Sequence, residues 1–212
     1  MADVVLVIPR VEAPDIDQAF LTSAQWASIP AVTFVCVADG EAAALPTELR
    51  PAWSGRGVHL RYRCIDPLPL SREFARDAPI DEEEVVGVFL DPVGERSQYL
   101  AILVSPYGRV ADARIENPRH HAQHSEVDLS WDCSGVRVRS SAGEGEWTIE
   151  LLIPFAGMTP AIRPPSAGDR WTGNFFRIER QPFVEITAWQ PTRRTPIDLH
   201  DTEVFGIIEF GG

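Results

Sequence analysis

The sequence predicts an all-β fold: an antiparallel β-sandwich, jelly-roll or immunoglobulin-like, with about nine or more strands and one short N-terminal helix. Its apolar runs are short, mostly alternate with period two, and are rich in Val, Ile, Phe, Tyr and Trp. The 15 Gly and 18 Pro separate these runs with turn clusters. No repeat or low-complexity linker divides the 212 residues, so residues 1–212 are expected to form a single domain.

The expected elements follow one another between the turn clusters. Helical patterning is confined to residues 15–28 and, more weakly, to 71–76. The expected strands cover residues 31–37, 58–65, 85–91, 99–106, 136–141, 147–154, 171–180, 185–191 and 204–210.

Charge and hydropathy narrow the classes of partner. The chain has 19 Lys and Arg against 31 Asp and Glu, a net charge of −12, which would repel a phosphate backbone and argues against a nucleic-acid partner. No run approaches the ~20 apolar residues of a membrane span, so no membrane partner is expected. The first residues lack a basic segment, and the apolar run Val4–Ile8 is too short for a signal peptide. The compartment stays open between the cytoplasm and export of a chain without its leader.

The three cysteines are far apart and odd in number. Cys36 and Cys64 lie in alternating apolar contexts, where buried free thiols are common. We expect structural thiols, with a single disulfide as the alternative. No zinc-ligand spacing is present.

Two charged residues stand in the middle of expected strands among large apolar neighbours. Alternation places Trp171, Phe175 and Arg177 on one face of 171–180, and Asn174 on the other. Glu150 lies in the middle of 147–154 between large apolar neighbours, on the face opposite Trp147 and Ile149. Because an isolated buried ion is costly, a Glu150–Arg177 ion pair is expected if the two strands are neighbours. Otherwise these polar groups line a ligand site.

Two loops have residue types that bind metals, and both leave alternatives open. His120, His121 and His124 follow Pro118 in a polar segment, which is either a solvated loop or a metal site. The acidic run at 80–86 is either a charged loop or a cation site, although it lacks the EF-hand pattern. The common catalytic signatures are also missing.

The six tryptophans are many for this length, and most are expected in the core. Trp189 stands where a strand gives way to a loop, and Trp53 is expected in a turn. An indole at the rim of a sandwich can stack on the C–H face of a sugar while polar neighbours bond its hydroxyls. His200, just before the last strand, is either a ligand group at this rim or a loop histidine.

Taken in order, several segments resemble the family 9 carbohydrate-binding modules, and most of all their stand-alone bacterial branch. They include "FLTSAQWASIPAV", "EEEVVGVFLDP", "GEWTIELLIPF", "GDRWTGNFFRIER", "AWQPT" and "HDTEVFGIIEF", and the resemblance runs from about Phe20 to Phe210. It implies a non-catalytic β-sandwich related to the DOMON group, whose relatives bind sugars, often with structural calcium, or in some cases haem. The matching positions are Trp147, Glu150, Pro154, Phe155, Asn174, Arg177, Trp189, Pro191, His200, Glu203, Phe205 and Gly206.

The chain departs from the family pattern at two places. Gly87 stands where family members often have a glutamate in mid-strand, so that contact is lost or moves to Glu83 or Glu84. The sugar-binding modules also have a tryptophan shortly before the last strand, where this chain offers only His200.

We therefore expect a non-catalytic module for a saccharide or small polyol. The expected ligand-binding residues are Trp189, Arg177, Asn174, His200, Glu150 and Trp53, and structural calcium is the only cofactor expected of such a module. Three alternatives remain at this point. The first is an interaction or scaffold sandwich without sugar binding. The second is a haem domain that uses Met158 with His200 or His124. The third is a glycosidase that pairs Glu150 with Glu179 or Asp201. The oligomeric state stays open.

Overall fold

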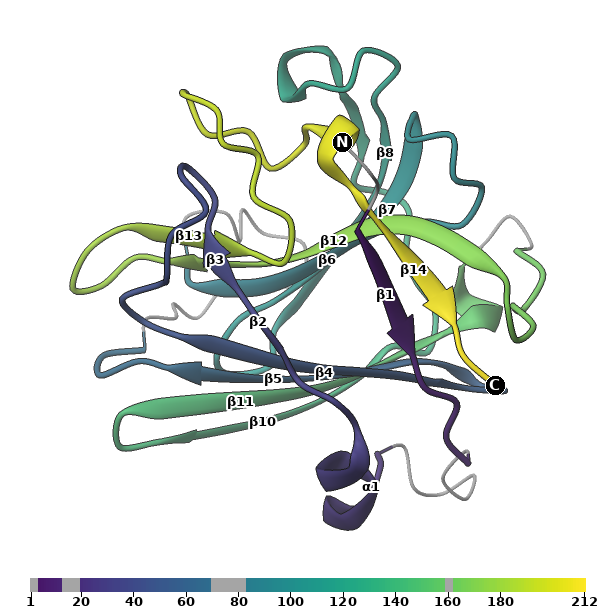
Figure 1. Cartoon of the computed structure of the whole chain (residues 1–212), viewed down its shortest axis with the longest axis horizontal. Coiled ribbons are helices and arrows are strands. Elements are labelled where there is room, and N and C mark those ends of the chain that lie inside the picture. Colours follow the sequence, from purple (N-terminus) through teal and green to yellow (C-terminus); the bar gives the residue numbers. More distant parts are fainter. Residues whose placement is uncertain (1–3, 13–19, 70–82, 159–161) are drawn as a thin grey trace.

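The computed structural model describes residues 4–12, 20–69, 83–158 and 162–212. In this part of the chain two β-sheets pack face to face, with one short α-helix below the smaller sheet (Figure 1). The elements are β1 (Val5–Ile8), α1 (Ser23–Ser28), β2 (Val32–Thr33), β3 (Val35–Cys36), β4 (Thr47–Ser54), β5 (Gly57–Ile65), β6 (Val85–Asp91), β7 (Gln98–Val104), β8 (Val110–Glu116), η2 (Ala122–His124), β9 (Glu126–Asp128), β10 (Arg137–Gly143), β11 (Glu146–Pro154), η3 (Phe155–Gly157), β12 (Arg170–Glu179), β13 (Glu185–Ala188), η4 (Thr202–Val204) and β14 (Gly206–Phe210).

The larger sheet has nine strands within the described residues, in the order β1-β14-β12-β6-β7-β8-β9, with β13 beside β12 and β3 beside β13. The smaller sheet has five, in the order β10-β11-β5-β4-β2. The described pairings are antiparallel apart from β1 and β14, which run parallel with Val5 opposite Ile207. The predicted β-sandwich is therefore confirmed, with one parallel pair at its edge.

Side chains alternate between the core and the outside as the sequence pattern predicts. On β11, Trp147 and Ile149 point into the core between the sheets, and Trp171 and Phe175 do so from β12. These rings belong to one large buried cluster to which both sheets contribute, so burial of apolar area against the opposite sheet holds the layers together.

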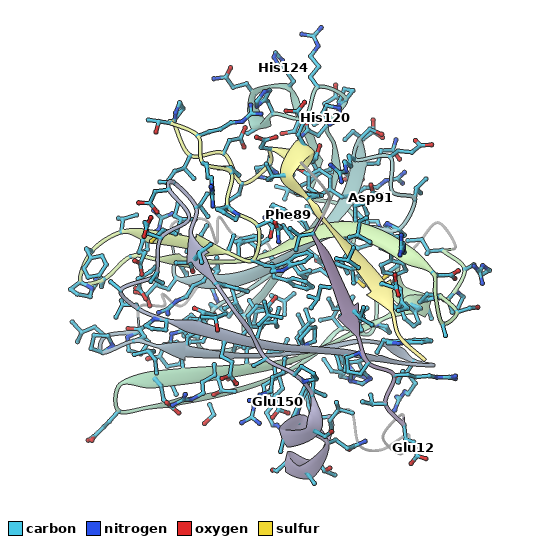
Figure 2. All side chains as sticks on the ribbon, viewed as in Figure 1. Glu12, Phe89, Asp91, His120, His124 and Glu150 are labelled. Atoms are coloured by element: carbon cyan, nitrogen blue, oxygen red, sulfur yellow. The ribbon has the colours of Figure 1, made fainter. Side chains whose placement is uncertain are left out.

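The outer faces of the two sheets differ. The outer face of the nine-stranded sheet is covered by a second apolar cluster, which includes Phe89, Tyr99, Phe176 and Phe205. Figure 2 marks Phe89 on this upper side and Glu150 on the lower side, next to α1. Among the described residues, α1 and the residues flanking it cover the five-stranded sheet around Ala52, and the Phe20 ring lies over the Arg139 guanidinium. The strand residues beyond that corner are mostly charged and partly exposed.

The nine predicted strands all lie on observed strands, but β1, β4, β8 and β9 were not predicted. Trp53 lies in β4 and not in a turn, so that prediction was wrong. Pro51 argues against a central strand because proline cannot donate to the ladder. The structure accommodates it because Pro51 pairs with Leu60 on one side and lies past the end of β2 on the other.

The helix is shorter than predicted. It begins after Thr22, whose side chain accepts from the Gln25 amide while the Gln25 side chain accepts from the Thr22 amide, a capping box. The helix ends at Ser28 and buries Trp26 against the five-stranded sheet. The first residues of the predicted helix, 15–19, and the predicted stretch 71–76 lie outside the described residues.

The cysteines are free thiols, as expected. Cys64 and Cys133 are buried and Cys36 is half-buried. Within the described residues no helix has the length and apolar character that crossing a membrane would require.

Candidate ligand-binding site

Trp189 follows β13 and lies half-buried against the core between the sheets. Its backbone N–H donates to the Phe175 carbonyl at 2.9 Å, and the two rings lie 5.8 Å apart at 52°. Gly206 lies behind the indole, where a Cβ would come within 2.3 Å of the indole Cη2. The lack of a side chain at position 206 therefore lets the indole pack closely against β14.

Asn174 fixes the chain just after Trp189. Its side chain donates to the Gln190 carbonyl at 2.9 Å and accepts from the Gln190 amide at 3.0 Å. It also accepts from the Phe175 amide at 2.9 Å, and the residue is fully buried. All of these contacts are with the backbone, so Asn174 positions the segment that carries Trp189 and faces no solvent.

Arg177 lies in the interior, on the opposite face of β12 from Asn174, and is 1% exposed. Its guanidinium forms ion pairs with Glu179 and, at 3.3 Å, with Asp66. It also donates to the carbonyl of Ile65 at 2.9 Å and lies 5.4 Å from the centre of the Trp147 ring. This network joins β12 of one sheet to β5 and β11 of the other.

The expected pair between Glu150 and Arg177 does not form. The two residues lie in different sheets, and Glu150 points to the outer face of β11, where it pairs with Arg139 and, at 3.8 Å, with Arg61. Each mid-strand ion therefore has its own partners, as the cost of an isolated buried charge requires.

Three buried carboxylates meet beside Arg177. The carboxylate oxygens of Asp66, Glu84 and Glu179 lie within 4.8 Å of one another, and this is the group among the described residues that could hold a metal ion. Hard oxygen donors of this kind suit calcium. Asp66 already accepts from the Trp147 indole N–H and the Leu68 amide, both at 2.8 Å. The Arg177 guanidinium also supplies a positive charge in the same place.

The other two predicted metal sites, in the acidic run 80–86 and among the loop histidines, lie away from these three carboxylates. Glu83 is buried and pairs with Arg109 at 2.7 Å, while residues 80–82 of the acidic run lie outside the described residues. His120 contacts the Thr202 hydroxyl at 2.7 Å, and His121 lies 3.5 Å from Asp198. Figure 2 shows His120 and His124 on the loops above the nine-stranded sheet. They form no metal-ligand group with the other described residues.

His200 belongs to the outer side of the nine-stranded sheet. Its Nδ1 lies 2.6 Å from the Tyr99 hydroxyl, and its ring lies 5.0 Å from that of Phe89. Burial lowers the pKa of His200, although Asp198 opposes the shift. Met158 is fully buried in the core between the sheets, so the two residues proposed as haem ligands lie in different layers.

Trp53 is buried, 3% exposed, with its ring edge-on to Phe210 at 5.4 Å and its indole N–H donating to the Gly211 carbonyl at 3.0 Å. The six predicted ligand residues thus lie in different layers, with Arg177 and Trp53 in the interior and His200 and Glu150 on opposite outer faces. Trp189 is half-buried, and Phe175 and Gly206 pack against its indole. The carboxylates considered for glycoside hydrolysis, Glu150, Glu179 and Asp201, also lie in three different layers.

Gly87 explains the missing mid-strand glutamate. It lies on β6 opposite Phe176 of β12, and a Cβ at this position would come within 2.2 Å of the Phe176 ring. The aromatic ring occupies the space where a side chain at position 87 would lie. In this chain the outer face of β6 is therefore packed with apolar groups.

Sequence reasoning missed Trp131, the second half-buried indole, which lies in the segment between β9 and β10 and packs against the core between the sheets. The signal available was its position in "DLSWDCS", a polar stretch without strand pattern. It also missed a row of arginines on the five-stranded sheet, signalled by the alternation in "VHLRYRC".

Three solved structures are similar to this one over nearly all of the chain. A protein from Bacteroides uniformis, described as a candidate carbohydrate-binding protein, matches with a TM-score of 0.78 and 17% identity, covering 99% of this chain and 100% of that one. A family 9 carbohydrate-binding module from Caldicellulosiruptor kristjanssonii in complex with cellotriose matches with a TM-score of 0.63 and 12% identity, covering 99% and 94%. The same organism's module with glucose gives 0.61 and 12%, covering 99% and 96%.

No protein-family model matches the sequence, and the search of curated proteins gives no match. At these identities the similarity establishes the fold, which does not fix the activity. This chain has the fold of the family 9 carbohydrate-binding modules, as the order of its sequence motifs predicts.

Proposed function

We propose that the protein is a non-catalytic binding module for a saccharide, with Trp189 as its stacking surface. The observation that supports this most is the full-length similarity to modules whose structures contain cellotriose and glucose. The similarity covers 99% of this chain and therefore includes both sheets and the terminal strand after Trp189.

The local geometry supports Trp189 as the stacking group. A stacking surface must be flat, partly exposed and held in place, because a mobile ring loses entropy when a ligand orders it. Phe175 and Gly206 support the indole from behind, and the Asn174 clamp fixes the residue that follows it. Among the six residues first considered, Asn174 supports this surface through Gln190, and the proposed ligand contact is made by the Trp189 indole.

The proposal does not require structural calcium, because Arg177 already supplies positive charge beside the buried carboxylates. The triad of Asp66, Glu84 and Glu179 supplies the oxygen donors, and an ion there would tie β12 to the segment after β5. It would act on stability and not on sugar contact, because the triad is buried.

Calorimetry with soluble mono-, di- and oligosaccharides at millimolar concentration tests the proposal. We expect binding to at least one neutral sugar, and Trp189→Ala should weaken it roughly tenfold or more, as the loss of an aromatic anchor does. Trp131→Ala is the matched control, because it removes a second half-buried indole. Circular dichroism confirms that both variants fold.

Two outcomes would contradict the proposal. Absence of binding to every sugar tested would favour the alternative of an interaction sandwich that binds no sugar. Equal loss in the Trp131 and Trp189 variants would show that binding does not depend on the Trp189 surface.

A further inference from the structure

The outer face of the five-stranded sheet concentrates arginines in an otherwise acidic protein. Strand alternation puts five of them on this face together with three glutamates, an excess of two positive charges in a chain of net charge −12. They are Arg50, Arg61, Arg63, Arg137 and Arg139, with Glu48, Glu146 and Glu150.

Two of these arginines face each other directly. Arg50 of β4 and Arg61 of β5 are register partners, and the row continues across the sheet to Glu150 and Arg139. Like charges directly opposite one another destabilise a strand pair. Arg50 is offset in part by Glu48, at 2.9 Å. Arg61 therefore lies between a like charge, Arg50, and an opposite charge, Glu150.

Arg61 makes no hydrogen bond within the described part of the chain. Its ion-pair partner is Glu150, whose carboxylate oxygen lies 3.8 Å away, beyond hydrogen-bond distance. Its side chain is 35% exposed, less than Arg63 at 49% and Arg139 at 54%. A guanidinium has five N–H donors in a planar fork, and those of Arg61 remain available to a ligand.

Arg61 lines a pocket between the sheet and α1. The pocket has a volume of about 360 Å³ and is lined by Arg50, Arg61 and Arg63, with Glu48 and Trp26. We call it the arginine pocket. Figure 1 shows α1 below the five-stranded sheet, and Trp26 and Ala27 of this helix line the pocket. Ligand pockets of ~300–1,000 Å³ hold small molecules, so a sugar ring has room here.

The helix side of the pocket is lined by Ser23, Trp26 and Ala27. Trp26 is 1% exposed and its indole Nε1 has no accessible surface, so a ligand in the pocket does not reach that N–H. The donors that the arginine pocket offers are therefore those of the guanidinium of Arg61.

We propose that the arginine pocket binds the carboxylate of an acidic saccharide, that is, a uronic-acid residue. A planar carboxylate matches the guanidinium fork of Arg61 in a two-bond pairing, and Arg50 and Arg63 add positive charge beside it. This inference rests on the proposed saccharide binding and names the sugar class: an acidic glycan that uses a second surface, separate from Trp189.

The test compares tri-galacturonate with its fully methyl-esterified form, which has the same sugar units without the charges. Calorimetry at low and high salt should show that the acidic trimer binds and the ester binds at least about tenfold more weakly. Added salt should weaken the acidic trimer alone, since screening acts on the charged contact.

Three variants locate the site. Arg61→Gln should lower affinity for the acidic trimer by about tenfold or more, the effect of losing a charged hydrogen-bond donor. Arg170→Gln is the matched control, because Arg170 is an exposed arginine paired with Glu209 at 2.7 Å on the other sheet. Glu48→Gln should raise the affinity, since it removes the carboxylate that competes for Arg50.

The outcomes separate this inference from the proposed function. Binding of neutral sugars that depends on Trp189, together with equal affinity for the acid and the ester, would overturn the inference and leave the function standing. Acid-selective binding that survives Trp189→Ala but is lost in Arg61→Gln supports the inference even if no neutral sugar binds. Inorganic sulfate that competes as strongly as the trimer would overturn the assignment to a saccharide.

Discussion

Arginine and glutamate occur together in two regions of this molecule, and their environments are opposite. In the core network, Arg177 is 1% exposed and bonded to Glu179, Asp66 and backbone carbonyls. On the outer face of the five-stranded sheet, Arg61 is 35% exposed and its acidic partner, Glu150, lies at 3.8 Å. Burial requires every charge to be paired, whereas the open face leaves donors unused, so the first region serves the fold and the second can serve a ligand.

The substitution with the largest expected effect on stability is Arg177→Met. It leaves Asp66 and Glu179 buried without their guanidinium, so we expect a loss of about 3–5 kcal/mol in the free energy of unfolding. Urea denaturation measures it, with Arg61→Gln as the control on the open face. A loss below that of the control would show that the buried network adds little to stability.

A second prediction concerns the pH dependence of stability. His59 lies on the outer face of the five-stranded sheet but, unlike Arg61, it is buried. Its Nε2 lies 2.9 Å from the Ser54 hydroxyl. Burial, with a smaller contribution from Arg56, lowers the pKa of His59 from 6.5 to about 4. Because the unfolded chain takes up a proton first, stability is fully present above pH 6.5 and is lost as the pH falls toward 4.

That loss should amount to roughly 3 kcal/mol in the free energy of unfolding. Urea unfolding at pH 7 and pH 4 measures it, and His59→Gln should make the fall smaller by that amount. Carboxylates titrate in both proteins and cancel in the comparison. An identical fall in wild type and variant would contradict the assignment to His59.

Arg63→Gln should lower the free energy of unfolding much less than Arg177→Met does. Arg63 pairs with Glu146 at the surface, with 49% and 41% of the two side chains exposed. Water and salt screen such a pair, so we expect a change of less than about 1 kcal/mol in the free energy of unfolding. A larger loss by urea denaturation would mean that the open face is a stabilising network like that of Arg177.

Calcium removal should have the smallest effect on stability, and it tests whether Arg177 alone supplies the positive charge that the buried carboxylates need. Arg177 already supplies a positive charge beside Asp66 and Glu179, so we expect EGTA to leave the melting temperature unchanged. In Arg177→Met the triad has lost this charge, and calcium should raise the melting temperature. A fall in the wild type on EGTA treatment would instead assign a resident ion to the triad.

Much of the fold could be predicted because alternation is a local property. The assignment of Trp171, Phe175 and Arg177 to one face of β12 follows from period two alone, and the structure confirms it for the two core rings. The strand β4 was missed because Pro51 argues against a central strand, and nothing local reveals that β2 stops short of it. β8 was missed because its small and charged residues alternate without strong hydrophobicity.

The site was harder to predict because it depends on which sheet each strand joins. Glu150 and Arg177 look alike in sequence, each a charge within an apolar strand, yet one lies on an outer face and the other in the core. Asn174 matched the family pattern, but its role as a backbone clamp follows from where Gln190 returns. Trp189 could be selected from sequence because the strand ends beside it.

The three thiols allow conformational opening to be timed. Burial raises the pKa of Cys64 to about 12, and burial with the neighbouring Glu185 raises that of Cys36 to about 11, so few thiolates exist at neutral pH. An alkylating reagent reacts with the thiolate, and therefore mainly with molecules whose strands have separated. Cys36 lies on β3 of the nine-stranded sheet and Cys64 on β5 of the five-stranded sheet. Comparison of their two labelling rates would show whether the two sheets separate before the rest of the molecule opens.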